Sequence, residues 1–185
     1  MDSLSLIPNL GLFITARENV PDFRRSSITH LVSIGELDPK VPLIEDWAVK
    51  PHLYRFEFDD VISDKGQPAI YQPPVEADLA RLLEIARTVA RTLETGAQVN
   101  LLVHCSMGVS RSAAAAYVII NAIVGNGHEE ECMNMVYQVR PVACPNYLLV
   151  AMGDRLLARG GAMTEAVRRH ILRQWGPGAR WGPTR

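Results

Sequence analysis

The sequence predicts an α/β fold with a central mixed, mostly parallel sheet flanked by helices. Short apolar runs of strand length occupy the first part of the chain, and longer runs with helical periodicity dominate the rest. Near the middle, an apolar strand-like run leads through a glycine-containing turn into an apolar helix-like run. Strands and helices in this order form α/β sheets, which bind ligands at the carboxyl ends of their strands.

Four short strands are predicted from apolar runs bounded by polar or turn-forming residues. They cover residues 10–14, 28–34, 53–58 and 100–103. The segments 35–42 and 63–74 are rich in turn-forming residues and predict loops between these elements.

Five helices are predicted from residue 76 onward. They cover residues 76–94, 112–120, 129–139, 146–158 and 164–174. The first is amphipathic and is followed by Gly96, a typical helix stop, whereas the second is apolar on all sides and is expected to be buried. Glycine and proline after residue 175 predict no regular structure. We expect one domain over residues 1–175 and a flexible or loosely docked tail over residues 176–185.

The composition is that of a globular domain without a strong net charge. The chain has 185 residues, 48% of them hydrophobic, and can bury a substantial core. Its 19 basic and 20 acidic residues nearly balance, so nucleic-acid binding is not expected. The longest apolar stretch, residues 113–120, is too short to span a bilayer.

Cysteine usage indicates a reducing compartment. Cys105, Cys132 and Cys144 are too few and too irregularly spaced for a disulfide framework or a zinc site. The N-terminal segment lacks basic residues and Pro8 interrupts its apolar run, unlike a secretory signal. We expect a cytoplasmic protein without membrane insertion, metal or cofactor, and we leave its oligomeric state open.

The most informative segment is residues 104–112, with the sequence HCSMGVSRS. At a strand-to-helix turn, the first backbone N–H groups of the helix lack internal partners and carry a partial positive charge, so they bind phosphate. Gly108 allows the backbone to approach such a ligand closely, and the Arg111 guanidinium can hold two phosphate oxygens. A Cys105 thiolate in this turn is stabilised by the same groups, which lowers its pKa to roughly 3.5–7.5.

These residues predict that Cys105 attacks a phosphorus atom. The alternative, in which Cys105 is a small buried apolar residue, leaves the glycine, arginine and serine of the segment unexplained. The residues that we expect to bind the phosphate are Ser106, Met107, Gly108, Val109, Ser110 and Arg111.

The spacing of Cys105 and Arg111, with His104 before and Ser112 after them, resembles the signature of the cysteine-dependent protein tyrosine phosphatase superfamily. The position of the loop sets aside low-molecular-weight phosphatases and arsenate reductases, whose loop lies near the N-terminus. Rhodanese-like sulfurtransferases have a shorter loop that does not need Ser112. The chain looks most like small, bacterial-type, single-domain dual-specificity phosphatases, whose fold and activity we therefore expect.

The resemblance implies a general acid on the loop after the third strand. The family pattern falls on Asp60, with Asp59 as the alternative, and residues 63–74 look like an insertion between this acid and Cys105. The other possibility is that either aspartate is only a solvated loop residue or a helix cap. A positioned acid is needed because an alkoxide or phenoxide leaves slowly unless it is protonated.

A second match extends over residues 140–146, RPVACPN, which resemble an Arg-Pro-x-x-x-Pro-Asn segment of the same family. It implies that Asn146 supports the phosphate loop and helps to orient the Ser112 hydroxyl. Asn146 is also a candidate helix N-cap, and both roles are compatible. Arg140 is expected to be structural rather than a second phosphate ligand. The resemblance further places His104 behind the loop, bonded to backbone, and gives Ser112 the role of stabilising the sulfur.

Three functions follow from this resemblance. The expected one is a phosphomonoester hydrolase with a cysteinyl-phosphate intermediate, acting on phosphotyrosine and other phosphoprotein residues. The alternative is a phosphatase of non-protein substrates, such as inositol phosphates, phosphoinositides, sugar phosphates or RNA 5′ ends. A non-catalytic phosphate-binding module is less favoured because Cys105 and Arg111 are both present. Uncharged side chains inside the loop favour a simple phosphate monoester, so the expected partner is a phosphorylated protein or a small phosphate ester.

Cys144 raises a further question because it lies two residues before Asn146. A reversible disulfide with Cys105 would protect the nucleophile from irreversible oxidation. We favour the simpler interpretation, in which Cys144 is a packing residue without a redox role.

Overall fold

A parallel four-stranded sheet forms the centre of the molecule. The computed structural model describes residues 6–36, 44–63 and 68–182. The strands are β1 (Leu10–Ala16), β2 (His30–Gly35), β3 (His52–Glu57) and β4 (Val99–Cys105), in the order β1-β4-β2-β3. Each pairing between them is parallel, so the expected α/β fold is confirmed and its described strands include no antiparallel one.

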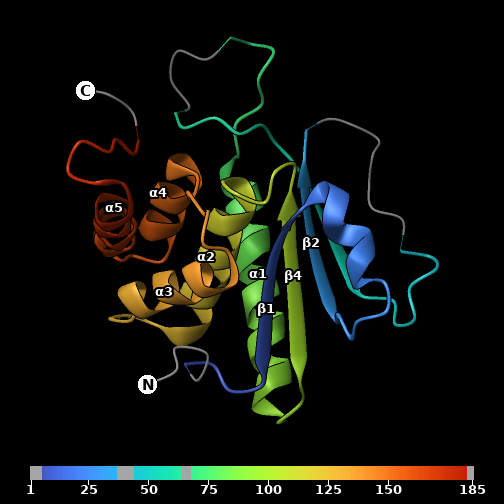
Figure 1. The fold of residues 1–185 in the computed structure, drawn as a ribbon. Helices are drawn as coiled ribbons and strands as arrows, with labels where there is room; N and C mark the ends of the chain where they lie inside the picture. Colours follow the sequence, from blue (N-terminus) through green and yellow to red (C-terminus); the bar gives the residue numbers. More distant parts are fainter. Residues whose placement is uncertain (1–5, 37–43, 64–67, 183–185) are drawn as a thin grey trace.

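Helices cover the two faces of the sheet unequally. Five α-helices gather on one side in Figure 1, whereas a short 3-10 helix, η2 (Arg17–Phe23), lies on the other. The α-helices are α1 (Glu76–Glu94), α2 (Arg111–Val124), α3 (Glu129–Val139), α4 (Tyr147–Leu156) and α5 (Ala162–Trp175). They match the helices predicted from sequence to within a few residues. Among the described residues, no helix combines the length and apolar character needed to cross a bilayer.

The alternation of side chains along the central strands produces two cores. Leu101 and Val103 of β4 face the α-helices and belong to the larger core, whereas Leu102 between them faces η2. The smaller core also contains Val20 and Trp47. Because both faces are covered, the central strands β2 and β4 are largely apolar, as parallel strands usually are.

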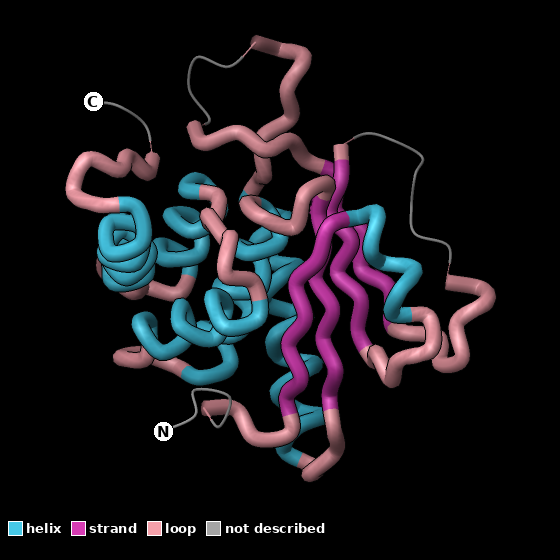
Figure 2. The backbone as a smooth tube through the Cα atoms, in the orientation of Figure 1, coloured by secondary structure: helices cyan, strands magenta, loops and turns pink. Residues whose placement is uncertain are grey.

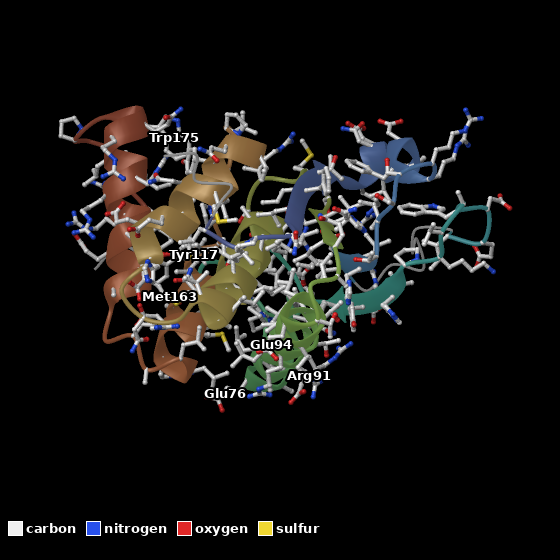
Figure 3. The ribbon with its side chains drawn as sticks, turned by 90° about the horizontal axis from the view of Figure 1, so that it is seen from below. Glu76, Arg91, Glu94, Tyr117, Met163 and Trp175 are labelled. Atoms are coloured by element: carbon white, nitrogen blue, oxygen red, sulfur yellow. The ribbon has the colours of Figure 1, made fainter. Side chains whose placement is uncertain are left out.

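Helix α2 is the most buried helix, as its apolar sequence predicts. Every residue from Arg111 to Asn121 is buried. Its Tyr117 hydroxyl donates to the carbonyl of Glu129 at 3.1 Å or of Met163 at 3.3 Å, which links α2 to α3 and α5. Figure 3 shows Tyr117 and Met163 within the helical layer, while Glu76 and Glu94 lie on the outer side of α1.

The topology brings loops from distant parts of the sequence to one edge of the sheet. All four strands run in the same direction, so their carboxyl ends meet at the upper edge in Figure 2. Strand β4 ends there at Cys105, and α2 begins at Arg111. The loop after β3 rises above the same edge (Figure 1).

The C-terminal segment packs against the domain although it has no regular structure. Residues 176–182 form no helix or strand, as expected from their glycines and prolines. The Trp181 indole N–H donates to the Pro145 carbonyl at 2.6 Å, and its ring meets Tyr147 edge to face, with centroids 5.0 Å apart. Ala179 also packs against the larger core. The described part of the predicted tail is therefore docked beside the start of α4.

Candidate active site

The loop between β4 and α2 is held against the end of β1. Gly108 has a φ of 68°, and a Cβ at this position would collide with the backbone of Thr15 and Ala16. On the same side, the backbone N–H of Arg17 donates to the Ser106 carbonyl at 3.3 Å. Glycine is required here for two reasons, a left-handed backbone and close contact with β1.

Cys105 lies at the bottom of this loop with only 2% of its surface exposed. Its sulfur is 3.2 Å from the Ser112 hydroxyl. Burial raises the pKa of the thiol, but hydrogen bonds from the Ser112 hydroxyl and from the backbone of Ser112 and Val109, together with the charge of Arg111, outweigh it. The net result is a lowered pKa, as expected for a thiolate at a helix N-terminus.

Arg111 is buried and anchored at both terminal nitrogens. One donates to the Phe58 carbonyl at 2.8 Å, and the other to Glu36 at 2.7 Å and to the Ser106 hydroxyl at 3.0 Å. Its Nε is buried and has no partner among the described residues. A buried guanidinium N–H without a partner is costly unless a ligand accepts it, so this group is available to an anion in the loop.

Glu36 is a site residue that the sequence analysis missed. Besides Arg111, its carboxylate accepts a hydrogen bond from Ser106 Oγ at 3.0 Å and pairs with Arg17 at 3.1 Å. Burial acts to raise its pKa, but its own backbone N–H and Arg111 lower it to about 2. Glu36 directly follows β2, so it lies at the carboxyl edge of the sheet, and this position could have indicated a site residue. It lies in the segment 35–42, whose turn-forming residues predict only a loop.

Residues 140–144 brace the loop from the side opposite β1. Arg140 donates through Nε to the Gly108 carbonyl at 2.9 Å and through a terminal nitrogen to the Met107 carbonyl at 3.0 Å. The backbone N–H of Cys144 donates to the Val109 carbonyl at 2.9 Å. Arg140 thus has the structural contacts that the sequence suggested.

Of the two aspartates, Asp60 contacts the phosphate loop. Its Oδ1 accepts hydrogen bonds from Ser110 Oγ at 2.7 Å and from Asn146 Nδ2 at 2.8 Å. Asp59 instead accepts the backbone N–H of Gln72 at 2.7 Å and closes its own loop. The geometry therefore favours Asp60 over Asp59 as the candidate acid. Part of the segment seen as an insertion, residues 64–67, lies outside the described residues.

Asn146 connects the candidate acid with helix α4. Its Oδ1 caps α4 by accepting the N–H of Leu149 at 2.9 Å, as its N-cap position suggests. Its Nδ2 donates to Asp60 and, at 2.9 Å, to the Val61 carbonyl. Within the described chain these are the side-chain contacts of Asn146. The amide therefore holds the acid loop, whereas the Ser112 hydroxyl faces Cys105 instead of Asn146.

His104 lies behind the loop and is completely buried. Burial lowers the pKa of its imidazole to about 4, and the nearby charges of Arg17 and Arg55 add to this, despite an opposing interaction with the Cys105 backbone. At neutral pH the ring is therefore uncharged. It adds no charge of its own to the site.

All three cysteines are free thiols. Burial raises the pKa of Cys144, and the charge of Asp60 raises it further, so its thiol is less ionised than that of Cys105. Burial raises the pKa of Cys132 to about 12. Cys144 packs against the larger core, so packing stays the favoured interpretation and a disulfide with Cys105 stays the alternative. Among the described residues, no group of three or more histidine, cysteine or carboxylate side chains is placed to hold a metal ion.

Comparison with known proteins shows which proteins this chain resembles in sequence. The chain is 29% identical over 168 residues to dual specificity protein phosphatase 15 of Rattus norvegicus, and 28% identical to that of Mus musculus. Each match covers 90% of this chain and 60% of the relative, so the chain spans about three fifths of the relatives' length. No protein-family profile matches the sequence.

Solved structures share the fold. Human DUSP28 superposes with a TM-score of 0.55 at 20% identity, covering 85% of this chain and 96% of its own. DUSP15 superposes with a TM-score of 0.56 at 18% identity, covering 86% and 89%. Human tyrosine phosphatase-like serine/threonine/tyrosine-interacting protein gives 0.56 at 18% identity, covering 83% and 93%. The chain is therefore similar in sequence to dual specificity protein phosphatase 15 and shares the fold of these solved structures, with its Cys105-to-Arg111 loop at the carboxyl edge of the sheet.

Proposed function

We propose that this chain is a phosphomonoester hydrolase that acts on phosphoproteins through a cysteinyl-phosphate intermediate. The observation that carries the proposal is the pairing of a thiol of lowered pKa with a buried, unpartnered guanidinium N–H in one loop. The first belongs to Cys105 and the second to Arg111. A nucleophile and an anion-binding group so placed fit covalent catalysis on a phosphate ester.

In the first step, the Cys105 thiolate attacks phosphorus and the bond from phosphorus to the ester oxygen breaks. Protonated Asp60 gives its proton to that oxygen, so the product leaves as an alcohol or phenol. The hydrogen bonds from Ser110 and Asn146 hold Asp60 over the loop for this transfer. Arg111 and the loop N–H groups balance the charge on the phosphoryl oxygens.

In the second step, water attacks the phosphocysteine and the sulfur–phosphorus bond breaks. Asp60, now a carboxylate, takes the proton from the water and is ready for the next cycle. The departing sulfur becomes a thiolate again, and the Ser112 hydroxyl 3.2 Å away stabilises it. Inorganic phosphate is the second product.

A phosphatase of non-protein substrates is the second candidate. One solved relative of the same fold, PTPMT1, was determined in complex with PI(5)P, and it superposes with a TM-score of 0.52 at 16% identity. The loop of this chain, however, carries the uncharged side chains of Ser106, Met107, Val109 and Ser110 between Cys105 and Arg111. A heavily charged headgroup would find no added cation there, so we favour a phosphoprotein monoester.

We also propose that the protein works in the reducing cytoplasm. A thiolate nucleophile must remain reduced to react, and a lowered pKa increases its exposure to oxidation. The three free cysteines fit such a compartment.

The proposal is tested by replacing Cys105 with serine. Cys105→Ser should abolish hydrolysis of phosphotyrosine peptides yet retain tungstate binding, because the loop N–H groups and Arg111 remain. Cys132→Ser is the matched control, since Cys132 is a buried thiol in α3 outside the loop. Turnover by purified Cys105→Ser would contradict the covalent mechanism. A parallel panel of soluble inositol phosphates separates the two candidate substrate classes.

A further inference from the structure

Exposed apolar side chains belong to the phosphate loop and to the two segments that contact it. We call four of them the apolar rim: Ile62, Tyr71, Met107 and Val142. They are 47%, 46%, 69% and 55% exposed, respectively. Large apolar side chains with this much exposure have no packing role that explains them, and a group of them beside a binding site is typical of an interaction surface.

Two members of the rim are fixed by direct contacts with the loop. Met107 belongs to the loop, and its carbonyl accepts a hydrogen bond from Arg140 at 3.0 Å. Val142 lies in the turn after Arg140, and that turn is fastened at its other end by the bond of Cys144 to the Val109 carbonyl, 2.9 Å. The Met107 and Val142 side chains are therefore carried by two backbone segments that are hydrogen-bonded to each other.

The other two members belong to the loop that carries the candidate acid. Ile62 lies two residues after Asp60, whose carboxylate binds Ser110 of the phosphate loop at 2.7 Å. The residue after Tyr71 exchanges two hydrogen bonds of 2.7 Å with Asp59. The rim thus combines side chains of the phosphate loop, of the turn after Arg140 and of the loop that carries the candidate acid.

Cationic side chains of the described site are bonded to other groups of the site. Arg111 and Arg17 both pair with Glu36, and Arg140 is bonded to loop carbonyls. The four rim side chains carry no charge. The rim therefore adds apolar surface beside the charged groups that bind the phosphate.

We propose that the apolar rim selects phosphoprotein substrates whose phosphorylated residue is flanked by large apolar side chains. The inference rests on the proposed phosphatase activity and names the substrate class of that same site. Apolar neighbours bury the rim when the phosphate enters the loop, and this burial adds to binding. A membrane surface is less favoured, because the four rim side chains are uncharged and give no attraction to anionic lipids.

The test compares two phosphotyrosine peptides that differ only beside the phosphotyrosine. One carries leucine or phenylalanine at the flanking positions, and the other carries serine or glutamate. For the wild-type protein, kcat/KM should be about tenfold higher for the apolar peptide. Val142→Ser should reduce that ratio about threefold or more, and so should Tyr71→Ser. Val49→Ser is the matched control, because Val49 is 49% exposed but precedes β3 at the opposite edge of the sheet.

Hydrolysis of p-nitrophenyl phosphate separates failure of this inference from failure of the phosphatase proposal. This small ester does not reach the rim, so both rim variants should hydrolyse it at the wild-type rate. Equal kcat/KM for the two peptides, or an equal loss in Val49→Ser and Val142→Ser, would overturn the rim proposal. A third result would assign the rim to membrane binding. In that case the protein floats with phosphatidylcholine vesicles, Val142→Ser abolishes this flotation, and the two peptides react at equal rates. That result would also overturn the rim proposal. If the wild type hydrolyses neither ester nor peptide, the phosphatase proposal itself fails.

Discussion

At the level of single residues, the carboxylates around the loop have separate structural roles. Asp60 accepts a hydrogen bond from Ser110 of the loop, Asp59 closes its own turn, and Glu36 pairs with Arg111. Because their contacts differ, replacing each carboxylate with the matching amide should have a different effect on the reaction.

Asp60→Asn should slow the hydrolysis of phosphotyrosine by about 10²–10⁴, because the leaving phenolate is no longer protonated. An activated aryl phosphate, whose leaving group needs little protonation, should be slowed much less. Steady-state kinetics with the two substrates measures the difference. Asp59→Asn serves as the neighbouring control, and a selective loss in that variant instead would show that the acid is one residue earlier.

Glu36→Gln should weaken vanadate binding about tenfold, because an Arg111 without its charged partner must be ordered when the anion binds. The variant also has a pH signature. In the folded protein the pKa of Glu36 is lowered from 4.5 to about 2, so its carboxylate stabilises the fold above pH 4.5 and this contribution is lost as the pH falls toward 2. Melting temperatures between these pH values should fall more steeply for the wild type. Tighter vanadate binding by Glu36→Gln would mean that Glu36 competes with the anion.

The nucleophile and the anion-binding groups could be identified because they lie in one short segment, whereas Glu36 lies far from that segment in the sequence. Cys105, Arg111 and Ser112 lie in one turn whose local geometry defines the chemistry. Glu36 reaches Arg111 only because β2 and β4 are neighbours in the sheet. A pairing of that kind requires the strand order, which a single sequence does not contain.

At the level of elements, the contact between β1 and the phosphate loop defines the shape of the cradle. Gly108 has no room for a Cβ because the backbone at the end of β1 lies against it. The loop therefore packs on a strand that is distant in sequence. Substitution of Gly108 should cost more stability and activity than substitution of a glycine whose only constraint is a positive φ.

Gly108→Ala should destabilise the protein by about 1–3 kcal/mol and abolish most activity, because both the backbone strain and the collision with Thr15 must be relieved. Gly127→Ala is the control for strain alone, since Gly127 has a φ of 86° but open space around it. Thermal unfolding and hydrolysis of an aryl phosphate measure the two effects. Equal losses in both variants would show that the contact with β1 contributes nothing beyond the strain.

Secondary structure was largely predictable because local patterns determine it here. The helix at 76–94 was predicted with the bounds that the structure has, since its apolar face and its glycine stop are both local signals. The contacts of Asn146 were predictable only as a cap, because its bond to Asp60 joins segments that are far apart in the chain. The docking of Trp181 had no local signal, since glycines and prolines around it indicate only the absence of regular structure.

At the level of the whole molecule, the C-terminal segment is connected to the candidate acid. Trp181 binds the Pro145 carbonyl, and the next residue, Asn146, holds Asp60. The C-terminal segment is therefore connected to a group that lies 121 residues earlier in the sequence, from Trp181 to Asp60, and this connection can be tested with a single substitution.

Trp181→Ala should lower stability by about 1–2 kcal/mol, because it removes a half-buried ring and one hydrogen bond. It should also slow phosphotyrosine hydrolysis more than hydrolysis of an activated aryl phosphate, since a displaced Asp60 affects only the first. Trp175→Ala is the matched control, because Trp175 is 50% exposed at the end of α5 (Figure 3). An equal loss with both substrates would limit Trp181 to a packing role.

The common direction of the strands also has a practical consequence. Every candidate site residue lies at or near the carboxyl edge, while the turn between α1 and β4, residues 95–98, lies at the opposite edge and is exposed. Gly96 in that turn has open space around it. A fluorophore or an immobilisation tag attached there would leave the reaction edge facing solution, so substrates could be screened on a surface without hindering the chemistry.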